Sequence, residues 1–369
     1  MDWAEVPPGA VDLDRSLVEA AARSAGDRLA GRGGAGHLVV LRRGRVVLDR
    51  AFGADRSSLF LIYSCSKAYT ALCVHLLVAR GQLALDEPVA TWWPEFGARG
   101  KDAITARHVL THRAGVPDDF AVWTLATATD WTASVHRMER LVPRWPAGEV
   151  TAYHALTQGW ILGELVRRAS GERVESLLRA ALLEPIGLRD TFLGLPPEEW
   201  SRSVPVVPAG GRTELANALV FNRRRYRQAV VPAATVSATG RDVARFFEML
   251  RCGGELDRVR VLRPETIAAA RQPAVDGGEV DADRTLGRPV RWAHGFHLGG
   301  VRSRADLGRF MGDLSAEDAF GAVGSDCCTA WVDPARELVF VYLTALLLPT
   351  GAGIAHHGLV ADCVLRACG

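Results

Sequence analysis

Residues 61–76 read LIYSCSKAYTALCVHL, and this stretch decides which fold the chain is expected to adopt. Ser64, Cys65 and Ser66 are three potential nucleophiles in a row, and Lys67 follows them. The chain has 44 lysine and arginine residues, of which only two are lysine. Arginine keeps its proton near neutral pH whereas lysine can lose it, so a lysine retained beside three nucleophiles suggests acid–base chemistry.

Helical spacing separates the three nucleophiles. The run of residues 64–80 predicts a helix. Positions i and i+3 share one helical face, so Ser64 can meet Lys67 while the two residues between them point elsewhere. In the first turn, free backbone N–H groups and the helix dipole favour negative charge on the Ser64 oxygen. Apolar neighbours would disfavour the charged form of Lys67 and let it act as a base; the alternative is a polar helix start without chemistry.

Length and composition limit the class of protein. With 369 residues, 48% hydrophobic and 23% charged, the chain predicts a two-lobed globular protein or one large α/β unit. The net charge of +2 suggests neither nucleic acid nor a membrane as a partner. An acidic N-terminus without an apolar stretch, and no apolar run long enough to span a membrane, lead us to expect a cytoplasmic location. Seven cysteines without a CxxC pair predict reduced thiols and neither a zinc site nor any other metal or cofactor.

The order of the periodic segments predicts the fold class. Strand-like runs flank a turn at Arg42, Arg43 and Gly44, helical patterns dominate from residue 81 to about residue 230, and strands return after residue 290. We therefore expect an α/β fold of the α+β type, in which an antiparallel sheet is built from both termini, is flanked by helices and carries an inserted helical lobe. The expected domains are residues 1–75 together with 232–369 for the sheet and 76–231 for the helices, with the active site in the cleft between them. Residues 272–290 are expected to form an exposed loop.

Several further segments match a recognisable pattern. They are RGQLALDEPV at residues 80–89, WPEF in the following loop, ITARHVLTHRAG, WPAGEVTAYHALTQGW and LLEPIGLRDTFLG. Together with the Ser-x-x-Lys helix, these motifs resemble the serine β-lactamase-like superfamily, in the branch of class C β-lactamases, family VIII carboxylesterases and related transacylases. The resemblance covers most of the chain and implies the β-lactamase/DD-peptidase-like fold described above.

The resemblance also implies which residues form the site. The family's Tyr-x-Asn motif falls on Tyr153, His154 and Ala155, so the tyrosine is retained and the substrate-binding asparagine is replaced. A phenol near a lysine can move a proton to or from the nucleophile or the leaving group.

The family's Lys-Thr-Gly or His-x-Gly motif falls on Ala322, Val323 and Gly324, so the cationic or imidazole position is an alanine. This loss argues against β-lactams as natural substrates. The backbone N–H groups of Ser64 and Ser325 would form the oxyanion hole, which needs no particular side chain.

The expected function is therefore a serine hydrolase or acyltransferase, with Ser64, Lys67 and Tyr153 as catalytic residues. It would act on a cytoplasmic ester, thioester or amide, which is the small-molecule acyl donor. The acceptor would be either water or a second small molecule, and the reaction would belong to secondary metabolism. An esterase or transacylase fits better than a β-lactamase. The alternative is an altered family member that binds or rearranges a metabolite without an acyl-enzyme, since two of the three motifs have changed.

Weaker patterns have a structural interpretation. GRGGAG at residues 31–36 matches GxGxxG but follows a helix and precedes a strand, the reverse of a dinucleotide site. His108 and His112 are four residues apart, which would place them on one helical face, but no HExxH motif is present and we interpret them as structural. The adjacent His356 and His357 cannot both face one metal ion.

Overall fold

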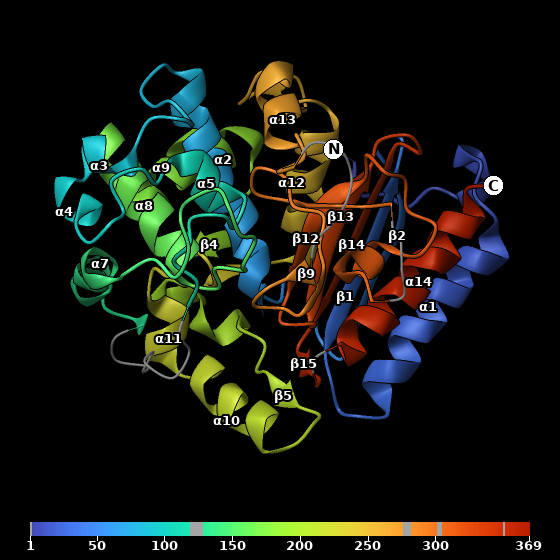
Figure 1. The fold of residues 1–369 in the computed structure, drawn as a ribbon. Helices are drawn as coiled ribbons and strands as arrows, with labels where there is room; N and C mark the ends of the chain where they lie inside the picture. The colour runs from blue at the N-terminus through green and yellow to red at the C-terminus, as the bar shows by residue number, and fades with distance from the viewer. Residues whose placement is uncertain (1, 119–127, 276–281, 301–304, 350) are drawn as a thin grey trace.

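A six-stranded antiparallel sheet forms the core of the fold (Figure 1). The computed structural model describes residues 2–118, 128–275, 282–300, 305–349 and 351–369. The strand order is β11-β12-β13-β14-β1-β2, so the N-terminal hairpin pairs with the C-terminal strand, with Val39 opposite Val341. The strands are β1 (Gly36–Arg42), β2 (Arg45–Phe52), β11 (His297–Leu298), β12 (Phe320–Gly324), β13 (Cys328–Asp333) and β14 (Leu338–Thr344).

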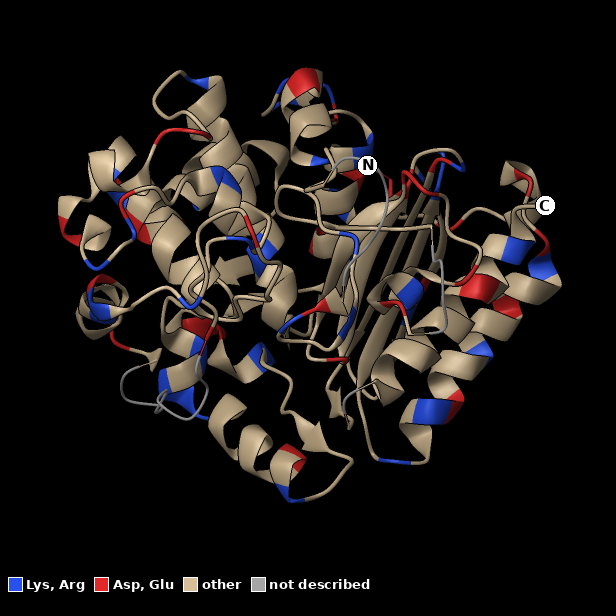
Figure 2. Cartoon of the chain, in the orientation of Figure 1, with Lys and Arg blue, Asp and Glu red and all other residues tan. Residues whose placement is uncertain are grey.

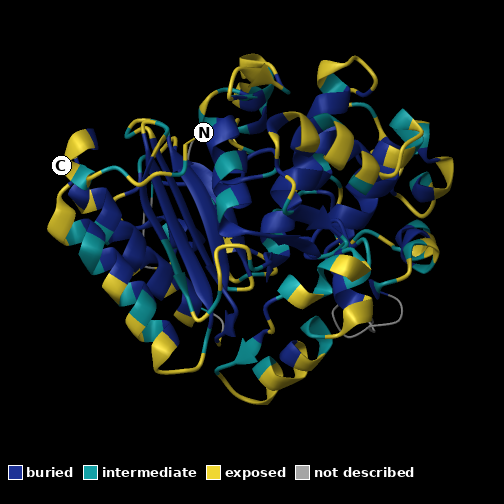
Figure 3. Cartoon of the chain, turned by 180° about the vertical axis from the view of Figure 1, so that it is seen from behind, coloured by how far each residue is buried: buried dark blue, intermediate teal, exposed yellow. Residues whose placement is uncertain are grey.

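Helices cover both faces of this sheet. On one face α1 (Arg15–Ala30) packs beside α14 (Ala352–Ala367), and on the other lies α12 (Gly240–Arg251) (Figure 1). Asp14 caps the start of α1 by accepting a hydrogen bond from the backbone N–H of Leu17. The central strands are buried on both faces, which Figure 3 shows as dark blue arrows between the exposed outer helices.

The second part of the molecule is mainly helical and is organised around α2 (Ser66–Ala79), which is buried along nearly its whole length. Helix α8 (Thr157–Ser170) packs near it. Gly159 of α8 permits a close approach to the segment before residue 236, because a Cβ there would lie 2.4 Å from the Ala233 nitrogen. The surrounding helices are α3 (Val89–Trp92), α4 (Pro94–Gly97), α5 (Ala106–Leu110), α7 (Trp131–Arg140), α9 (Val174–Leu178), α10 (Arg212–Phe221), α11 (Arg224–Gln228) and α13 (Pro264–Ala270).

Short strands connect the two parts. A three-stranded sheet has the order β3-β6-β4, with β3 (Phe60–Leu61) leading directly into the nucleophile segment. The remaining strands are β4 (Thr191–Leu193), β5 (Val207–Pro208), β6 (Val236–Ala238), β7 (Glu255–Leu256), β8 (Val259–Arg260), β9 (Ala282–Asp283), β10 (Arg288–Pro289) and β15 (Leu346–Leu347). Basic and acidic residues occur on both the helical part and the sheet part (Figure 2).

The architecture confirms the predicted α/β class with an antiparallel sheet built from both termini. The hairpin at Arg43 and Gly44 is confirmed, and residues 31–36 connect α1 to β1. The boundaries expected for the two domains stay a prediction. All seven cysteines are free thiols, and no helix among the described residues is long and apolar enough to cross a membrane.

Two local predictions were wrong. Residues 272–290 are not simply an exposed loop: residues 276–281 lie outside the described residues, but β9 and β10 pair and Asp283 is completely buried. His112 does not share a helical face with His108, because α5 ends at Leu110 and His112 has a φ of 58°. His108 instead caps the start of α5, where its Nδ1 accepts a hydrogen bond from the backbone N–H of Thr105.

Candidate active site

Ser64 lies in a single 3-10 turn, Tyr63–Cys65, immediately before α2. The sequence predicted Ser64 in the first turn of the α-helix. The structure places it in the 3-10 turn that precedes the helix. The turn is held on both sides by β6: the backbone N–H of Ile62 donates to the Val236 carbonyl, and the Val236 N–H donates to Ser66 Oγ. Tyr63 has a φ of 49°, a conformation that costs energy for a residue with a side chain.

The three potential nucleophiles have different surroundings. Ser66 is buried and engaged with β6, as described above. Cys65 is also buried, and desolvation raises the pKa of its thiol well above the usual value, so it stays uncharged. Ser64 alone reaches both Lys67 and Tyr153.

Lys67 faces neutral oxygen atoms. Its Nζ donates to the carbonyl oxygens of Ala155, at 2.7 Å, and Ala233, at 3.3 Å, and lies 3.3 Å from Ser64 Oγ. Only 6% of the residue is exposed. The amino group thus has three oxygen partners, two backbone carbonyls and the serine hydroxyl, and it is held within reach of the Ser64 proton.

Tyr153 completes the contacts of the serine. Its hydroxyl donates a hydrogen bond of 2.7 Å to Ser64 Oγ, and Lys67 Nζ lies 5.0 Å from the centre of its ring. The ring stacks on Trp292, with ring centres 5.7 Å apart and an angle of 3° between the planes. The arrangement gives Ser64 an amine on one side and a phenol on the other.

Asp283 holds the backbone of Tyr153 in position. The carboxylate is completely buried, and its Oδ1 accepts hydrogen bonds from the backbone N–H groups of Tyr153 at 3.0 Å, Thr285 at 2.9 Å and Leu286 at 3.0 Å. Its Oδ2 accepts from Trp292 Nε1 at 3.2 Å. One carboxylate therefore positions both the backbone of Tyr153 and the indole that stacks on its ring. Sequence reasoning missed it, because Asp283 stands in a polar stretch without any motif.

Buried imidazoles lie around Tyr153 and its stacking partner Trp292. His112 Nδ1 accepts from the His154 backbone N–H at 3.1 Å, and its ring lies 4.2 Å from Trp292 and 4.9 Å from Tyr153 between ring centres. Burial lowers the pKa of His154 to about 4 and that of His297 to about 3. The same desolvation lowers the pKa of His112, so these rings are uncharged and pack as aromatic groups near neutral pH.

The end of β12 approaches the serine at close range. A Cβ on Gly324 would lie 2.2 Å from the Ile62 carbonyl oxygen and 3.0 Å from the Ser64 nitrogen, so only glycine fits here. The next two residues, Ser325 and Asp326, have φ values of 46° and 56° and form a tight turn into β13. Asp326 anchors that turn by accepting a hydrogen bond through Oδ2 from the Gly351 backbone N–H.

The chain resembles known proteins over nearly its full length. The sequence profile of the family described as Beta-lactamase matches residues 19–363. The chain belongs to the Beta-lactamase family.

Relatives with an assigned activity are esterases as well as β-lactamases. The chain is 30% identical over 364 residues to Esterase/beta-lactamase LipL of Mycobacterium tuberculosis, a match that spans 89% of this chain and 81% of that protein. Among solved structures it is similar to EstA from Arthrobacter nitroguajacolicus, with a TM-score of 0.81 at 26% identity and coverage of 100% of this chain and 99% of the other. A family VIII carboxylesterase matches with a TM-score of 0.80 at 25% identity, covering 98% and 99% of the two chains. These similarities identify this Beta-lactamase family member as a serine hydrolase of the β-lactamase-like type.

The other expected site positions can now be placed in this family member. Ala155 is buried and contributes its carbonyl oxygen to Lys67, a role for which the side chain is irrelevant. Ala322 is 3% exposed and lies two residues before Gly324 on β12. His154 is completely buried, and its Nε2 accepts a hydrogen bond from the backbone N–H of Val116. We therefore assign His154 to the support of the site and not to contact with the substrate.

Other cysteines and histidines of the chain also lie in the interior. Cys327 and Cys328 are both completely buried, and burial raises the pKa of the Cys328 thiol to about 12. His356 and His357 are buried between α14 and the sheet, where His356 Nε2 lies 3.4 Å from the Tyr342 hydroxyl. Among the described residues, no group of three or more histidine, cysteine, aspartate or glutamate side chains is arranged to hold a metal ion.

Proposed function

We propose that the chain is an esterase that works through an acyl-enzyme on Ser64, with Lys67 and Tyr153 as its acid–base pair. One observation carries this proposal: Ser64 Oγ lies 3.3 Å from Lys67 Nζ and 2.7 Å from the Tyr153 hydroxyl. A hydroxyl between an amine and a phenol can give its proton to the first and accept a hydrogen bond from the second.

The proton transfers follow from these contacts. Uncharged Lys67 takes the proton of Ser64 as the Ser64 oxygen attacks the carbonyl carbon of the ester. Tyr153 gives its proton to the departing alkoxide, and Lys67 then returns a proton to Tyr153, so both groups regain their starting forms. Attack of water on the acyl-enzyme, with loss of one proton to the same pair, releases the acid and restores Ser64.

The negative oxygen formed at each attack would be held by the backbone N–H groups of Ser64 and Ser325. Support comes from the close approach of Gly324 to the Ser64 nitrogen, which brings the end of β12 beside the 3-10 turn. Preorganised donors of this kind contribute about 3–4 kcal/mol each to the stability of the transition state.

The preferred substrate is an ester or thioester whose acyl group carries no further charged group. Ala322 stands where the family has a lysine or a histidine, so this position offers no cation to a substrate carboxylate. Ala155 stands where an asparagine would bind a substrate amide. Both replacements disfavour β-lactams and peptides, and neither removes a group that ester cleavage requires.

An acceptor alcohol or amine in place of water would convert the hydrolase to an acyltransferase. The cytoplasmic location and a place in secondary metabolism stay predictions from the sequence. The alternative of a family member without an acyl-enzyme is disfavoured by the intact contacts among Ser64, Lys67 and Tyr153.

The experiment compares hydrolysis of nitrophenyl acetate, butyrate and octanoate with that of nitrocefin, for the wild-type protein and for Lys67→Met and Tyr153→Phe. We expect ester turnover well above nitrocefin turnover. Each variant should lose about 10²-fold to 10⁴-fold in kcat with a smaller change in KM, as expected for a lost acid–base group. Nitrocefin turnover equal to ester turnover, or full activity in either variant, would contradict the proposal.

A further inference from the structure

A groove lined by arginine side chains lies at the start of α12, and none of Ser64, Lys67 and Tyr153 lines it. Its volume is about 810 Å³, within the range of about 300–1,000 Å³ that is typical of small-molecule sites. We call it the arginine groove and define it by Arg56, Arg189, Arg241 and Arg245. These residues come from the turn after β2, the segment before β4 and the first turns of α12.

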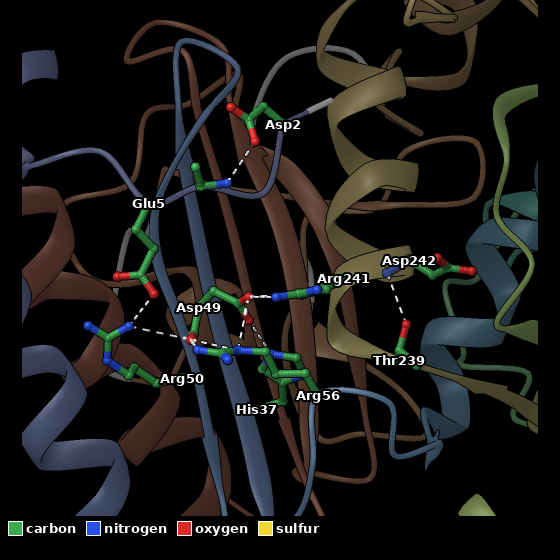
Figure 4. Close-up of polar contacts among 10 residues, drawn as sticks. Asp2, Glu5, His37, Asp49, Arg50, Arg56, Thr239, Arg241 and Asp242 are labelled. Atoms are coloured by element: carbon green, nitrogen blue, oxygen red, sulfur yellow. Dashed lines mark hydrogen bonds and ion pairs between the residues drawn. The ribbon is translucent and has the colours of Figure 1, made fainter.

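The carboxylates near the groove leave part of this positive charge unneutralised. Asp49 is 1% exposed and binds two of the guanidinium groups: its Oδ2 lies 2.6 Å from Arg241 Nη2 and 3.2 Å from Arg56 Nε (Figure 4). One negative charge therefore serves two positive ones. Its Oδ1 is occupied by His37, at 2.7 Å.

The two acidic residues of the groove wall are engaged elsewhere. Asp190 pairs with Arg202, at 2.7 Å, and Arg202 does not line the groove. The carboxylate of Asp242 accepts hydrogen bonds from the Asp190 backbone N–H and from Thr191 Oγ1, and it points away from Arg241 (Figure 4). Among the described residues, neither wall carboxylate forms an ion pair with Arg189 or Arg241, while Asp242 interacts electrostatically with Arg245.

Hydrogen-bond donors remain available. Arg245 uses Nη2 for the Ile186 carbonyl and for Asp257, whereas its Nε is buried without a partner. Arg241 is clamped by Asp49 through Nε and Nη2 and by the Trp3 ring, whose centre lies 4.9 Å from the guanidinium carbon. Arg189 is exposed and has no ion pair or hydrogen bond with any described residue. Arg241 is thus held in place at the groove, and the exposed Arg189 is free to close on a ligand.

We propose that the arginine groove binds the phosphate group of a small phosphorylated metabolite. A phosphate carries nearly two negative charges and several acceptor oxygens, so it can take parallel hydrogen bonds from more than one guanidinium fork. Helix α12 adds the positive end of its dipole at the same place. A carboxylate group matches these donors less well, because it has one charge and two oxygens, and a dicarboxylate such as succinate carries its two charges on separate groups.

The groove is linked to the esterase site through one short segment. Thr239 lines the groove and caps α12, β6 precedes it directly, and the Ala233 carbonyl farther upstream accepts from Lys67. A phosphate compound bound at the start of α12 therefore lies on the segment that supports both Lys67 and the nucleophile turn. The proposal does not depend on esterase activity, since binding is measured by itself.

The test is calorimetric titration of the full-length protein with inorganic phosphate, glycerol 3-phosphate and succinate at constant ionic strength. We expect glycerol 3-phosphate and phosphate to bind at one site and succinate to bind at least about tenfold more weakly. The variant Arg189→Ala should weaken phosphate binding by about tenfold. We expect it to fold, because the exposed Arg189 has no ion pair or hydrogen bond with a described residue to lose.

A matched control separates a site from general attraction to a basic surface. Arg212 is exposed at the start of α10 and does not line the groove, so Arg212→Ala should leave phosphate binding within about twofold of the wild type. A second groove variant, Arg241→Gln, should also weaken binding. Absence of phosphate binding, equal binding of succinate, or equal loss in the Arg189 and Arg212 variants would overturn the proposal.

Discussion

Replacement of Asp283 by alanine tests whether a residue outside every motif positions the catalytic tyrosine. The change removes the acceptor of four buried hydrogen bonds, from Tyr153, Thr285, Leu286 and Trp292. A buried donor without a partner costs about 1–3 kcal/mol, and part of this is regained because the desolvated carboxylate disappears. We expect Asp283→Ala to lower the free energy of unfolding by about 3–5 kcal/mol. Asp283→Asn keeps an acceptor for the three backbone groups but turns an N–H toward Trp292, so it should cost about 1–2 kcal/mol.

Activity distinguishes positioning from simple destabilisation. If Asp283 acts through Tyr153, kcat for nitrophenyl butyrate should fall by about tenfold to a hundredfold in Asp283→Ala, measured where denaturation curves show the variant to be folded. In a protein that already carries Tyr153→Phe, the same alanine should cost almost nothing further in kcat, because the hydroxyl it positions is absent. Additive losses in the double variant, or full activity in Asp283→Ala, would refute the reasoning.

Three further predictions concern stability and the oxyanion hole. Burial lowers the pKa values of His75 and His154 to about 4 and of His297 to about 3, below the ordinary value of 6.5. The folded state therefore binds fewer protons than the unfolded state, and the free energy of unfolding should fall as the pH drops from 6.5 toward 4. Each residue contributes up to about 1.4 kcal/mol per pH unit, and melting temperatures that stay constant between pH 7 and pH 5 would contradict this. Lys101→Met should lower the free energy of unfolding by about 2–4 kcal/mol with kcat unchanged, since buried Lys101 donates to the carbonyls of Ala98, Glu139 and Leu141. An unchanged free energy of unfolding in urea denaturation would contradict this prediction. Asp326→Ala frees the turn that carries Ser325 and should lower kcat by about tenfold with little change in KM, whereas an increase in KM alone would assign Asp326 to substrate binding instead.

The large elements were predictable because their signals are local. Two β-rich runs on both sides of Arg43 and Gly44 predict a hairpin, and the structure confirms it. The scarcity of lysine was informative in a second way. Lys101, like Lys67, is buried and donates to backbone carbonyls, a role that suits the compact amino group of lysine better than a planar guanidinium.

The support of the site was not predictable because it depends on contacts between distant segments. Asp283 meets Tyr153 across 130 positions of sequence, and the Ala233 carbonyl reaches Lys67 across 166. A backbone carbonyl has no sequence signature at all. The position of His112 was mispredicted because its positive φ ends the helix there, and a histidine is not a recognised helix terminator.

The most direct test of the account is the intact mass of the protein after reaction with a fluorophosphonate probe. The wild-type protein should gain the mass of one probe, with the label on Ser64, and Ser64→Ala should gain none. Cys65→Ala and Ser66→Ala should label like the wild type, because both side chains are buried and face other partners. Unchanged labelling of Ser64→Ala, or an unlabelled wild-type protein, would contradict the assignment of Ser64 as the nucleophile.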